Sequence, residues 1–301
     1  MDRLTFQSLS TPEIARIVQA DGPKVCVFAL NGTRRWFMLE HAKPNEDFAT
    51  AYLNAITKRY IEIAQLLFEH GINTLLMPAL SPYLMARGSS YIELAATALS
   101  QLTKQPQFLD FYNSYKVRVR FYGDYEQCFA DTPYAYLPSQ FDALTTQTVT
   151  NNQHRLLWGV CAHDATETTI ALSIRFYEKH GRAPNKQELI TMYYGESIPP
   201  VNIFISSAKL RAFDMPLINS GREDLYYSVS PSPYFTISQL RDILYDHLFA
   251  RHKEKVDYST LQTEKWAELR TFYQTNLSNT LGVGQKDDAG IWHPTPQVIL
   301  P

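Results

Sequence analysis

The chain has 301 residues, of which 45% are hydrophobic, and its 28 basic side chains nearly balance its 30 acidic ones. The net charge of −2 excludes a strongly basic protein that coats nucleic acid. The length and apolar content are sufficient for one large domain or two ordinary ones. No apolar run approaches the roughly 18 residues of a membrane span, so we expect a cytoplasmic protein without stable membrane insertion.

Short β-rich runs alternate with helical patterns along the first 250 residues. This alternation predicts an α/β fold with a mostly parallel central sheet flanked by helices. Two short extended segments are expected near residues 216–218 and 226–229. Five longer runs are expected to form strands: KVCVFAL (24–30), TLLMPAL (74–80), KVRVRFYGD (116–124), LLWGVCA (156–162) and VNIFIS (201–206).

The helices between these runs have recognisable ends. The first is expected to begin with Asn45 as its N-cap and to end at Gly71, because Asn favours helix starts and Gly favours helix stops. A second helix, over about 164–180, is expected to end at Gly181, and a third, NKQELITMYYG, at Gly195. The segment TISQLRDILYDHLFARHK has the apolar spacing of a fourth helix.

The domain organisation follows from the distribution of breaks along the chain. No Pro/Ser/Gly linker or internal repeat divides the first 250 residues, which favours a single domain over 1–255. Beyond about residue 255 the chain is polar and lacks a clear period. We therefore predict an irregular C-terminal extension over 256–301.

The loop after the first predicted strand carries the strongest chemical signal. In Asn31-Gly32-Thr33-Arg34-Arg35, a glycine, a hydroxyl and two arginines occur together where a helix is expected to begin. Ligands of parallel sheets bind beyond the carboxyl ends of the strands, where backbone N–H and guanidinium groups suit a phosphate or diphosphate. The spacing and lysine of a Walker A loop are absent. A turn with two solvated arginines is the alternative that these residues alone leave open.

Several segments resemble motifs of the cis-prenyltransferases, the family of undecaprenyl diphosphate synthase. NGTRRW (31–36) is similar to the family's DGNxRW loop, and VRVRFYGD (117–124) is similar to its VRxRxIGD strand. Longer stretches, among them LINSGREDLYYSVSPSPY (217–234), resemble the branch with tuberculosinyl adenosine transferase and kolavelool synthase. The resemblance implies a cis-prenyltransferase fold, a diterpenyl diphosphate substrate, Mg²⁺ as cofactor and a homodimer.

The resemblance also implies which residues bind the diphosphate. Arg34, Arg35 and Arg87 are expected to hold it together with Gly32 and Thr33. Guanidinium groups would neutralise the charge that grows as the diphosphate leaves, so Arg34 and Arg35 count as catalytic.

The remaining expected site residues surround the reacting carbon. Asn31 and Tyr52 are expected to orient the attacking nucleophile, and Tyr91 and Tyr226 are expected to be pocket walls. Tyr52 alone would be interpreted as core packing, and its catalytic role rests on the resemblance. Asn31 is the main departure from the family, which has Asp there to bind Mg²⁺ or accept a proton. An amide is a weaker metal ligand than a carboxylate and is not a base.

The predicted function is therefore a diterpene synthase. It would ionise a bicyclic diterpenyl diphosphate of the kolavenyl or tuberculosinyl type and quench the allylic cation with water. Two alternatives stay open: transfer of the terpenyl group to adenosine, and a non-catalytic subunit of a prenyltransferase. Chain elongation is not expected, because Ile218 and Asp224 replace the arginines with which elongating relatives bind a second diphosphate.

Overall fold

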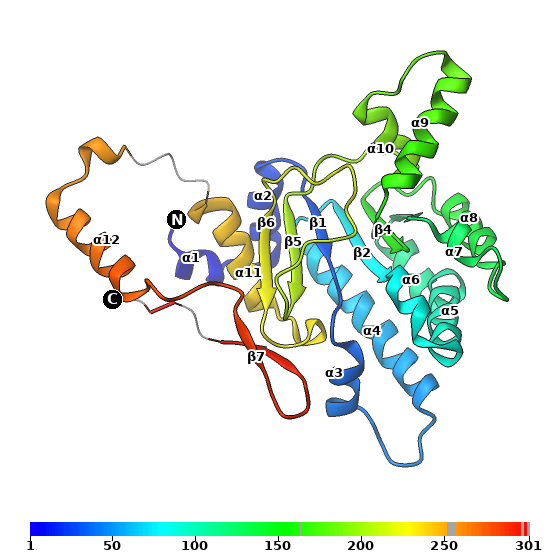
Figure 1. The fold of residues 1–301 in the computed structure, drawn as a ribbon, viewed down its shortest axis with the longest axis horizontal. Helices are drawn as coiled ribbons and strands as arrows, with labels where there is room; N and C mark the ends of the chain where they lie inside the picture. The colour runs from blue at the N-terminus through cyan, green and yellow to red at the C-terminus, as the bar shows by residue number, and fades with distance from the viewer. Residues whose placement is uncertain (163, 252–256, 296–297, 300–301) are drawn as a thin grey trace.

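A computed structural model describes residues 1–301 except 163, 252–256, 296–297 and 300–301. Its central sheet has six parallel strands in the order β3-β4-β2-β1-β5-β6 (Figure 1). The predicted α/β class with a parallel sheet is confirmed. The strands are β1 (Val25–Phe28), β2 (Thr74–Leu80), β3 (Val117–Tyr122), β4 (His154–Val160), β5 (Ile203–Ser207) and β6 (Asp224–Ser228).

All five longer runs form strands, and β6 forms where the extended segment near 226–229 is expected. The other short segment, near 216–218, is a turn, and the prediction of an extended segment there is wrong. Leu217 has a φ of 66°, in the left-handed region that strands do not use. Ile218 is nevertheless fully buried, which explains why the sequence there has the apolar character of a strand.

The sheet has a hydrophobic core on each face. In β1, Cys26 and Phe28 belong to one core, whereas Val25 and Val27 belong to the other. Because both faces are covered, the strand is an unbroken apolar run, as is typical of parallel sheets. The helices that contribute to the first core are α1 (Arg3–Ser8), α2 (Thr11–Ala20), α4 (Phe48–Glu69), α5 (Ser89–Lys104), α6 (Pro106–Ser114), α7 (Tyr125–Phe129), α8 (Leu137–Gln147) and α11 (Ile237–Tyr245).

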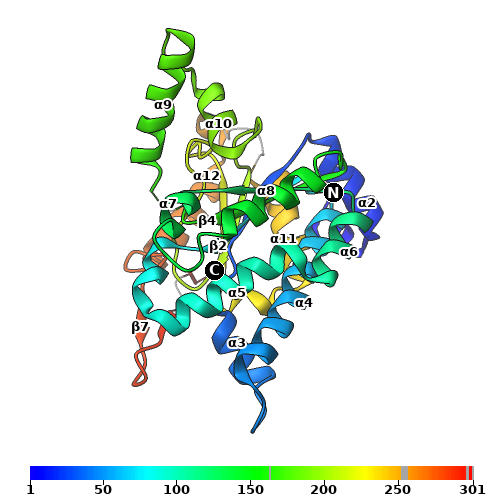
Figure 2. The same ribbon diagram turned by 90° about the vertical axis from the view of Figure 1, so that its right-hand side faces the viewer.

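Two helices on the other face pack onto the second core. They are α9 (Thr166–His180) and α10 (Lys186–Tyr194), and they project away from α3 and α4 (Figure 2). Both end at the predicted glycines, Gly181 and Gly195, which adopt the left-handed conformation of helix C-caps. The short helix α3 (Thr33–Glu40) follows β1 and packs against α4 through Trp36 and Phe37.

The N-cap of α4 differs from the prediction. Asp47, not Asn45, caps this helix by accepting a hydrogen bond from the Thr50 amide at 2.9 Å. Asn45 has a φ of 66°, whereas an N-cap residue needs an extended backbone, so the helix begins later than expected. The C-terminal end agrees with the prediction, because α4 ends at Glu69 and Gly71 has a positive φ just beyond it.

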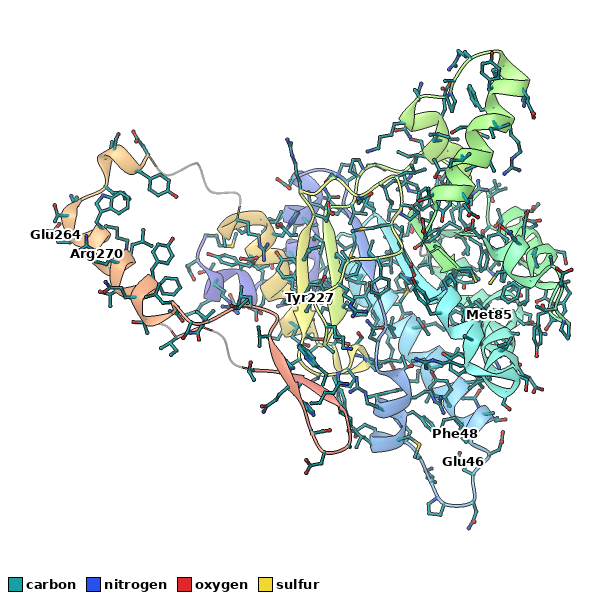
Figure 3. All side chains as sticks on the ribbon, viewed as in Figure 1. Glu46, Phe48, Met85, Tyr227, Glu264 and Arg270 are labelled. Carbon is teal, nitrogen blue, oxygen red and sulfur yellow. The ribbon has the colours of Figure 1, made fainter. Side chains whose placement is uncertain are left out.

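The C-terminal extension is more regular than predicted. It contains α12 (Thr263–Thr275) and an antiparallel pair, β7 (Gly284–Lys286) with β8 (Trp292–Pro294). No residue of α12 is buried, so this helix lacks the apolar stripe that would reveal it in the sequence. Glu264 and Arg270 of α12 lie away from the sheet (Figure 3). The domain boundary at residue 255 stays a prediction.

Helix α11 continues into a π-helical turn over Asp246–Ala250, so the predicted fourth helix forms as far as it can be followed. Its expected last two residues, 252 and 253, lie outside the described residues. Among the helices that are described, none combines the length and apolar character that crossing a membrane requires.

Candidate active site

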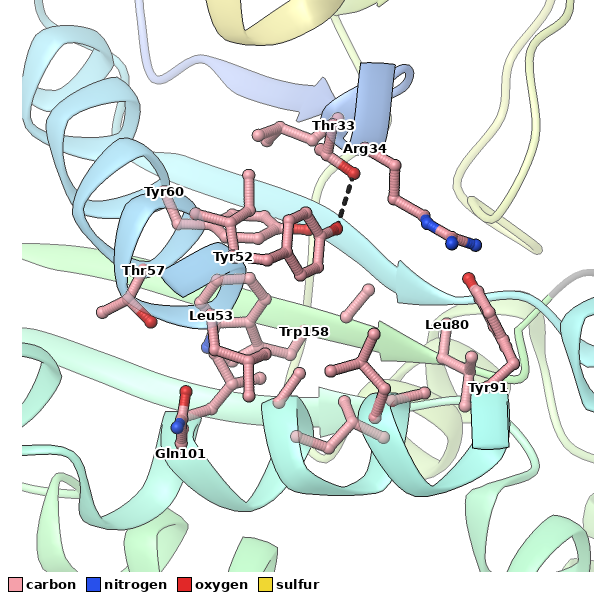
Figure 4. Close-up of a pocket in the computed structure, with 18 of the residues that line it drawn as sticks. Thr33, Arg34, Tyr52, Leu53, Thr57, Tyr60, Leu80, Tyr91, Gln101 and Trp158 are labelled. Carbon is pink, nitrogen blue, oxygen red and sulfur yellow. Dashed lines mark hydrogen bonds between the residues drawn. The ribbon is translucent and has the colours of Figure 1, made fainter. Parts of the chain in front are cut away.

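A cavity of about 440 Å³ lies at the carboxyl end of the sheet, between the loop after β1 and helices α4 and α5 (Figure 4). This is where ligands bind in open α/β sheets. One end of the cavity is polar and the other is apolar. Its polar and aromatic lining residues include Asn31, Gly32, Thr33, Arg34, Arg35, Tyr52, Thr57, Tyr60, Arg87, Tyr91, Gln101, Phe108 and Trp158. Of the nine residues expected at the site from the sequence, all but Tyr226 line this cavity.

Gly32 shapes the polar end of the cavity. It is the N-cap of α3 and has a φ of 77°, a left-handed conformation that side chains disfavour. A Cβ at this position would also lie 2.9 Å from Cβ of Pro231, which packs over the loop. The loop therefore requires glycine, both for its backbone conformation and for the packing of Pro231.

Asn31 is held by two serines, one near the end of β5 and one in the segment that follows β6. Its side-chain amide donates to Oγ of Ser206 at 2.7 Å, and its backbone N–H donates to Oγ of Ser232 at 3.1 Å. The Ser232 N–H in turn donates to the Asn31 carbonyl at 2.9 Å. These bonds place the amide group beside Gly32 and restrict its orientation.

Three arginines supply positive charge to the polar end. Arg34 and Arg35 lie in the first turn of α3, and Arg87 ends the 3₁₀ helix η1 (Pro82–Arg87). The Arg34 guanidinium lies 5.8 Å from the centre of the Phe48 ring, and that of Arg87 lies 5.3 Å from the Tyr91 ring. Within the described residues, no carboxylate forms an ion pair with any of the three. Their charge is therefore available to an anionic ligand.

Tyr52 projects from α4 toward this end. Its hydroxyl lies 2.8 Å from Oγ1 of Thr33, a hydrogen bond that is drawn in Figure 4. Burial raises the pKa of Tyr52 above its usual value, although the bond from Thr33 opposes the shift. The phenol thus keeps its proton at neutral pH and can donate as well as accept.

Tyr60 is a lining residue that is not among the site residues expected from the sequence. It lies two turns after Tyr52 on α4, and the charges of Tyr52 and Tyr91 contribute to its raised pKa, with burial as the larger cause. Three tyrosines therefore surround the cavity. The spacing of Tyr60 along α4 is also that of a core residue, so no local signal in the sequence identifies it as a lining residue.

The apolar end is closed by aromatic rings from separate parts of the chain. The Trp158 ring of β4 lies 5.4 Å from that of Tyr60 and 6.0 Å from that of Phe108 on α6, in edge-to-face arrangements. Leu53 and Ile56 of α4 and several small or apolar residues of α5 complete the wall. This end can shelter a hydrocarbon group and a cation from bulk water.

Tyr226 differs from the expectation of a pocket wall. It lies on the edge strand β6, and its hydroxyl donates to Oδ2 of Asp246 at 2.8 Å while Arg251 lies over its ring at 4.8 Å. These contacts hold Tyr226 at the edge of the sheet, outside the cavity lining. A strand position can point to either face, which the sequence resemblance does not resolve.

The residues present do not fit a magnesium ion. Mg²⁺ in diphosphate sites is usually held by one or two carboxylates in addition to substrate oxygens. The described lining of the cavity contains no Asp or Glu, and no group of metal-binding side chains is found elsewhere in the described residues. At the position where the family has Asp, the Asn31 amide donates to Ser206.

Comparison with known proteins agrees with this architecture. The chain is 40% identical to tuberculosinyl adenosine transferase of Mycobacterium tuberculosis over 289 residues, which covers 95% of this chain and 96% of the relative. It is 23% identical to (+)-kolavelool synthase of Herpetosiphon aurantiacus over 295 residues, which covers 94% and 96%. No family model matches the sequence.

Two solved structures have a similar fold. Lavandulyl diphosphate synthase from Lavandula x intermedia, solved in complex with dimethylallyl diphosphate, has a TM-score of 0.61 and 15% identity, covering 80% of this chain and 98% of that one. A probable undecaprenyl diphosphate synthase from Campylobacter jejuni has a TM-score of 0.57 and 16% identity, covering 77% and 97%. The fold is thus that of the cis-prenyltransferases. The chain belongs to the branch of this family that contains tuberculosinyl adenosine transferase and kolavelool synthase, and it is an enzyme of that fold.

Proposed function

We propose that the protein ionises a bicyclic diterpenyl diphosphate of the kolavenyl or tuberculosinyl type, and that water captures the allylic cation to give a diterpene alcohol. The observation that carries this proposal is one cavity with three arginines at one end, none of them ion-paired to a described carboxylate, and aromatic walls at the other. A terpenyl diphosphate has the same division between an anionic head and a hydrocarbon body. The curated relatives support the diterpene class by their names.

The proposed reaction assigns a role to each end of the cavity. The bond between the allylic carbon and the diphosphate oxygen breaks, and both electrons stay on the diphosphate. Arg34, Arg35 and Arg87 stabilise this charge as it develops, together with the backbone of Gly32 and the hydroxyl of Thr33. The aromatic rings stabilise the cation and exclude bulk water until capture.

Capture by water completes the proposed reaction. Asn31 and Tyr52 hold one water near the reacting carbon, and its oxygen forms the new carbon–oxygen bond. The surplus proton passes to the departing diphosphate, which is the strongest base at the site because the described lining contains no carboxylate. The products are a tertiary or primary diterpene alcohol and diphosphate.

A second candidate is transfer of the same terpenyl group to adenosine. The relative with 40% identity is named as such a transferase. In addition, a second hollow of about 390 Å³ shares Leu53, Leu94 and Gln101 with the cavity. The rest of its lining is mostly polar and could hydrogen-bond a nucleoside: Ala49, Thr50, Asn54, Ser90, Glu93 and Thr97.

The test is to incubate the purified protein with kolavenyl and tuberculosinyl diphosphate, with and without adenosine, and to identify products by mass spectrometry. A diterpene alcohol in both cases supports the synthase. A terpenyl adenosine formed at the expense of the alcohol supports the transferase. Neither product from either substrate would contradict the proposed function and favour the non-catalytic subunit.

A companion incubation with farnesyl diphosphate and labelled isopentenyl diphosphate tests chain elongation. We expect no label in a longer chain, because Ile218 is fully buried in the core and Asp224 binds His247 Nδ1 at 2.7 Å. Neither residue can neutralise a second diphosphate. Label in a longer prenyl chain would return the protein to the polyprenyl synthases.

A further inference from the structure

We propose that this enzyme binds and ionises its diphosphate substrate without a divalent cation, and that the guanidinium groups of Arg34, Arg35 and Arg87 perform the electrostatic work of the metal. This inference rests on the proposed function, because it concerns the same substrate in the same cavity. It goes beyond that function in assigning a cofactor-free ionisation to a fold whose family is expected to use Mg²⁺.

The first argument is the composition of the cavity lining. The described lining residues include three arginines and no carboxylate. Two carboxylates that flank the polar end in sequence have other partners: Glu40 accepts from the Tyr234 hydroxyl, and Asp47 caps α4 by accepting from the Thr50 amide at 2.9 Å. Glu93, which precedes the lining residue Leu94, is exposed and lines the adjoining hollow, not the cavity. A magnesium ion at this site would therefore depend for its binding on neutral groups and on the substrate alone.

The second argument is the orientation of Asn31. Its amide is a donor toward Ser206 at 2.7 Å, and Ser206 in turn lies 3.5 Å from the Ala29 carbonyl. With its N–H bound to Ser206, the amide leaves only a neutral carbonyl oxygen for a ligand, which does not replace an anionic metal ligand. Two bonds to Ser232 fix the Asn31 backbone, and the bond to Ser206 fixes its side-chain amide.

The third argument is charge balance. A diphosphate ester carries roughly three negative charges when fully ionised, and the three guanidinium groups carry one positive charge each at any physiological pH. The arginines alone thus neutralise the leaving group. A bound Mg²⁺ without a carboxylate would leave the polar end with excess positive charge in a partly buried site.

The test compares the metal-stripped parent protein in EDTA with the same protein in Mg²⁺, with a diterpenyl diphosphate as substrate. We expect kcat/KM in EDTA to stay within about twofold of its value in Mg²⁺. A loss of more than about tenfold in EDTA, with turnover in Mg²⁺ intact, would overturn the metal-free mechanism and leave the proposed function standing. Absence of turnover in both conditions would contradict the proposed function itself.

A binding measurement separates the inference from catalysis. Titration calorimetry with inorganic diphosphate in EDTA should show binding to the parent protein, and Arg35→Ala should weaken it by about tenfold or more. Added Mg²⁺ should not tighten the binding. Binding of inorganic diphosphate only when Mg²⁺ is present would overturn the proposal.

The Asn31→Asp variant supplies the converse test. A carboxylate beside Gly32 should create a metal ligand, so we expect turnover of this variant to rise in Mg²⁺ and to fall below the parent in EDTA, where the new charge repels diphosphate. Asn152→Asp is the matched control, because Asn152 is exposed and precedes β4, at the amino ends of the strands and away from the cavity. An Asn31→Asp variant that responds to Mg²⁺ no more than the parent and the control would count against the inference.

Discussion

The two ends of the cavity are built in different ways. The polar end comes largely from five consecutive residues, 31–35, between β1 and the first turn of α3. The apolar end is assembled from α4, α5, α6 and β4, which are far apart in sequence and meet only in the folded protein. The polar residues have ligands as their expected partners, whereas the apolar residues also belong to the main core. We therefore expect substitutions at the polar end to affect turnover and those at the apolar end to affect stability first.

The largest expected effect on stability is that of Trp158→Ala at the apolar end. Trp158 is 1% exposed, packs against Tyr60 and Phe108, and donates from Nε1 to the Tyr112 hydroxyl at 3.3 Å. Truncation should lower the free energy of unfolding by about 3–5 kcal/mol, measured by urea denaturation. Trp266→Ala is the control, because Trp266 is 44% exposed on α12 and should cost less than about 0.5 kcal/mol. Equal stability of the two variants would contradict the predicted core role.

The next effect is expected at the polar end, from Arg34→Ala and Arg35→Ala. Each lost charge-assisted contact is worth about 1.5–3 kcal/mol, so kcat/KM should fall about 10- to 150-fold. The free energy of unfolding should stay unchanged, since neither arginine forms an ion pair with a described residue. Arg175→Ala on the exposed face of α9 should leave turnover unchanged. Full activity in both cavity variants would place the diphosphate elsewhere.

The sequence predicts most of the fold and of the polar end because both depend on patterns that are local in the chain. Strands such as β1 are apolar because both faces of the sheet are covered. Helices α9 and α10 end at glycines because their C-caps adopt the left-handed backbone conformation that glycine favours. Asn31 and its four successors form one local motif, so neighbours in sequence are also neighbours in space. The functional roles of these residues, and the homodimer, stay predictions.

The rest depends on long-range packing that no local pattern encodes. Tyr60 has the spacing of a core residue, and only the approach of α4 to β4 shows that it lines the cavity beside Trp158. Tyr226 is on a short edge strand, and its hydroxyl donates to Asp246, a residue outside the cavity lining and 20 positions along the chain. Asn45 has the composition of an N-cap, but its left-handed backbone leaves that role to Asp47.

A smaller effect is expected for Gly32→Ala, which tests whether the polar end also has a structural role. The left-handed backbone should cost about 1–2 kcal/mol of stability, and the new Cβ would lie 2.9 Å from Pro231 and shift the loop. Gly181→Ala is the matched control, because Gly181 has a φ of 67° with nothing within 4 Å of the added Cβ. Gly32→Ala should lose at least as much unfolding free energy as Gly181→Ala, and only Gly32→Ala should also slow turnover. Equal turnover in the two variants would show that the loop tolerates displacement.

The smallest effect is expected from the hydroxyl pair of Tyr52 and Thr33. Their oxygens lie 2.8 Å apart, and one neutral hydrogen bond is worth about 0.5–1.5 kcal/mol, so Tyr52→Phe should lower kcat about 2- to 10-fold. If the two hydroxyls act as a unit that orients the water, Thr33→Val should add little to the Tyr52→Phe variant, because the bond is already lost. Additive losses in the double variant would separate the two hydroxyls and reduce Tyr52 to a wall of the cavity.

The pH dependence of the parent provides a separate check on Tyr52. Because burial raises the pKa of Tyr52, its phenol stays protonated at higher pH than a free tyrosine, and kcat should not fall through its ionisation below about pH 10. Tyr52→Phe should therefore have the same profile as the parent between neutral pH and that limit, at a lower plateau. A fall of kcat near pH 8 that disappears in Tyr52→Phe would show a phenol of lowered pKa and contradict the environment described for the polar end.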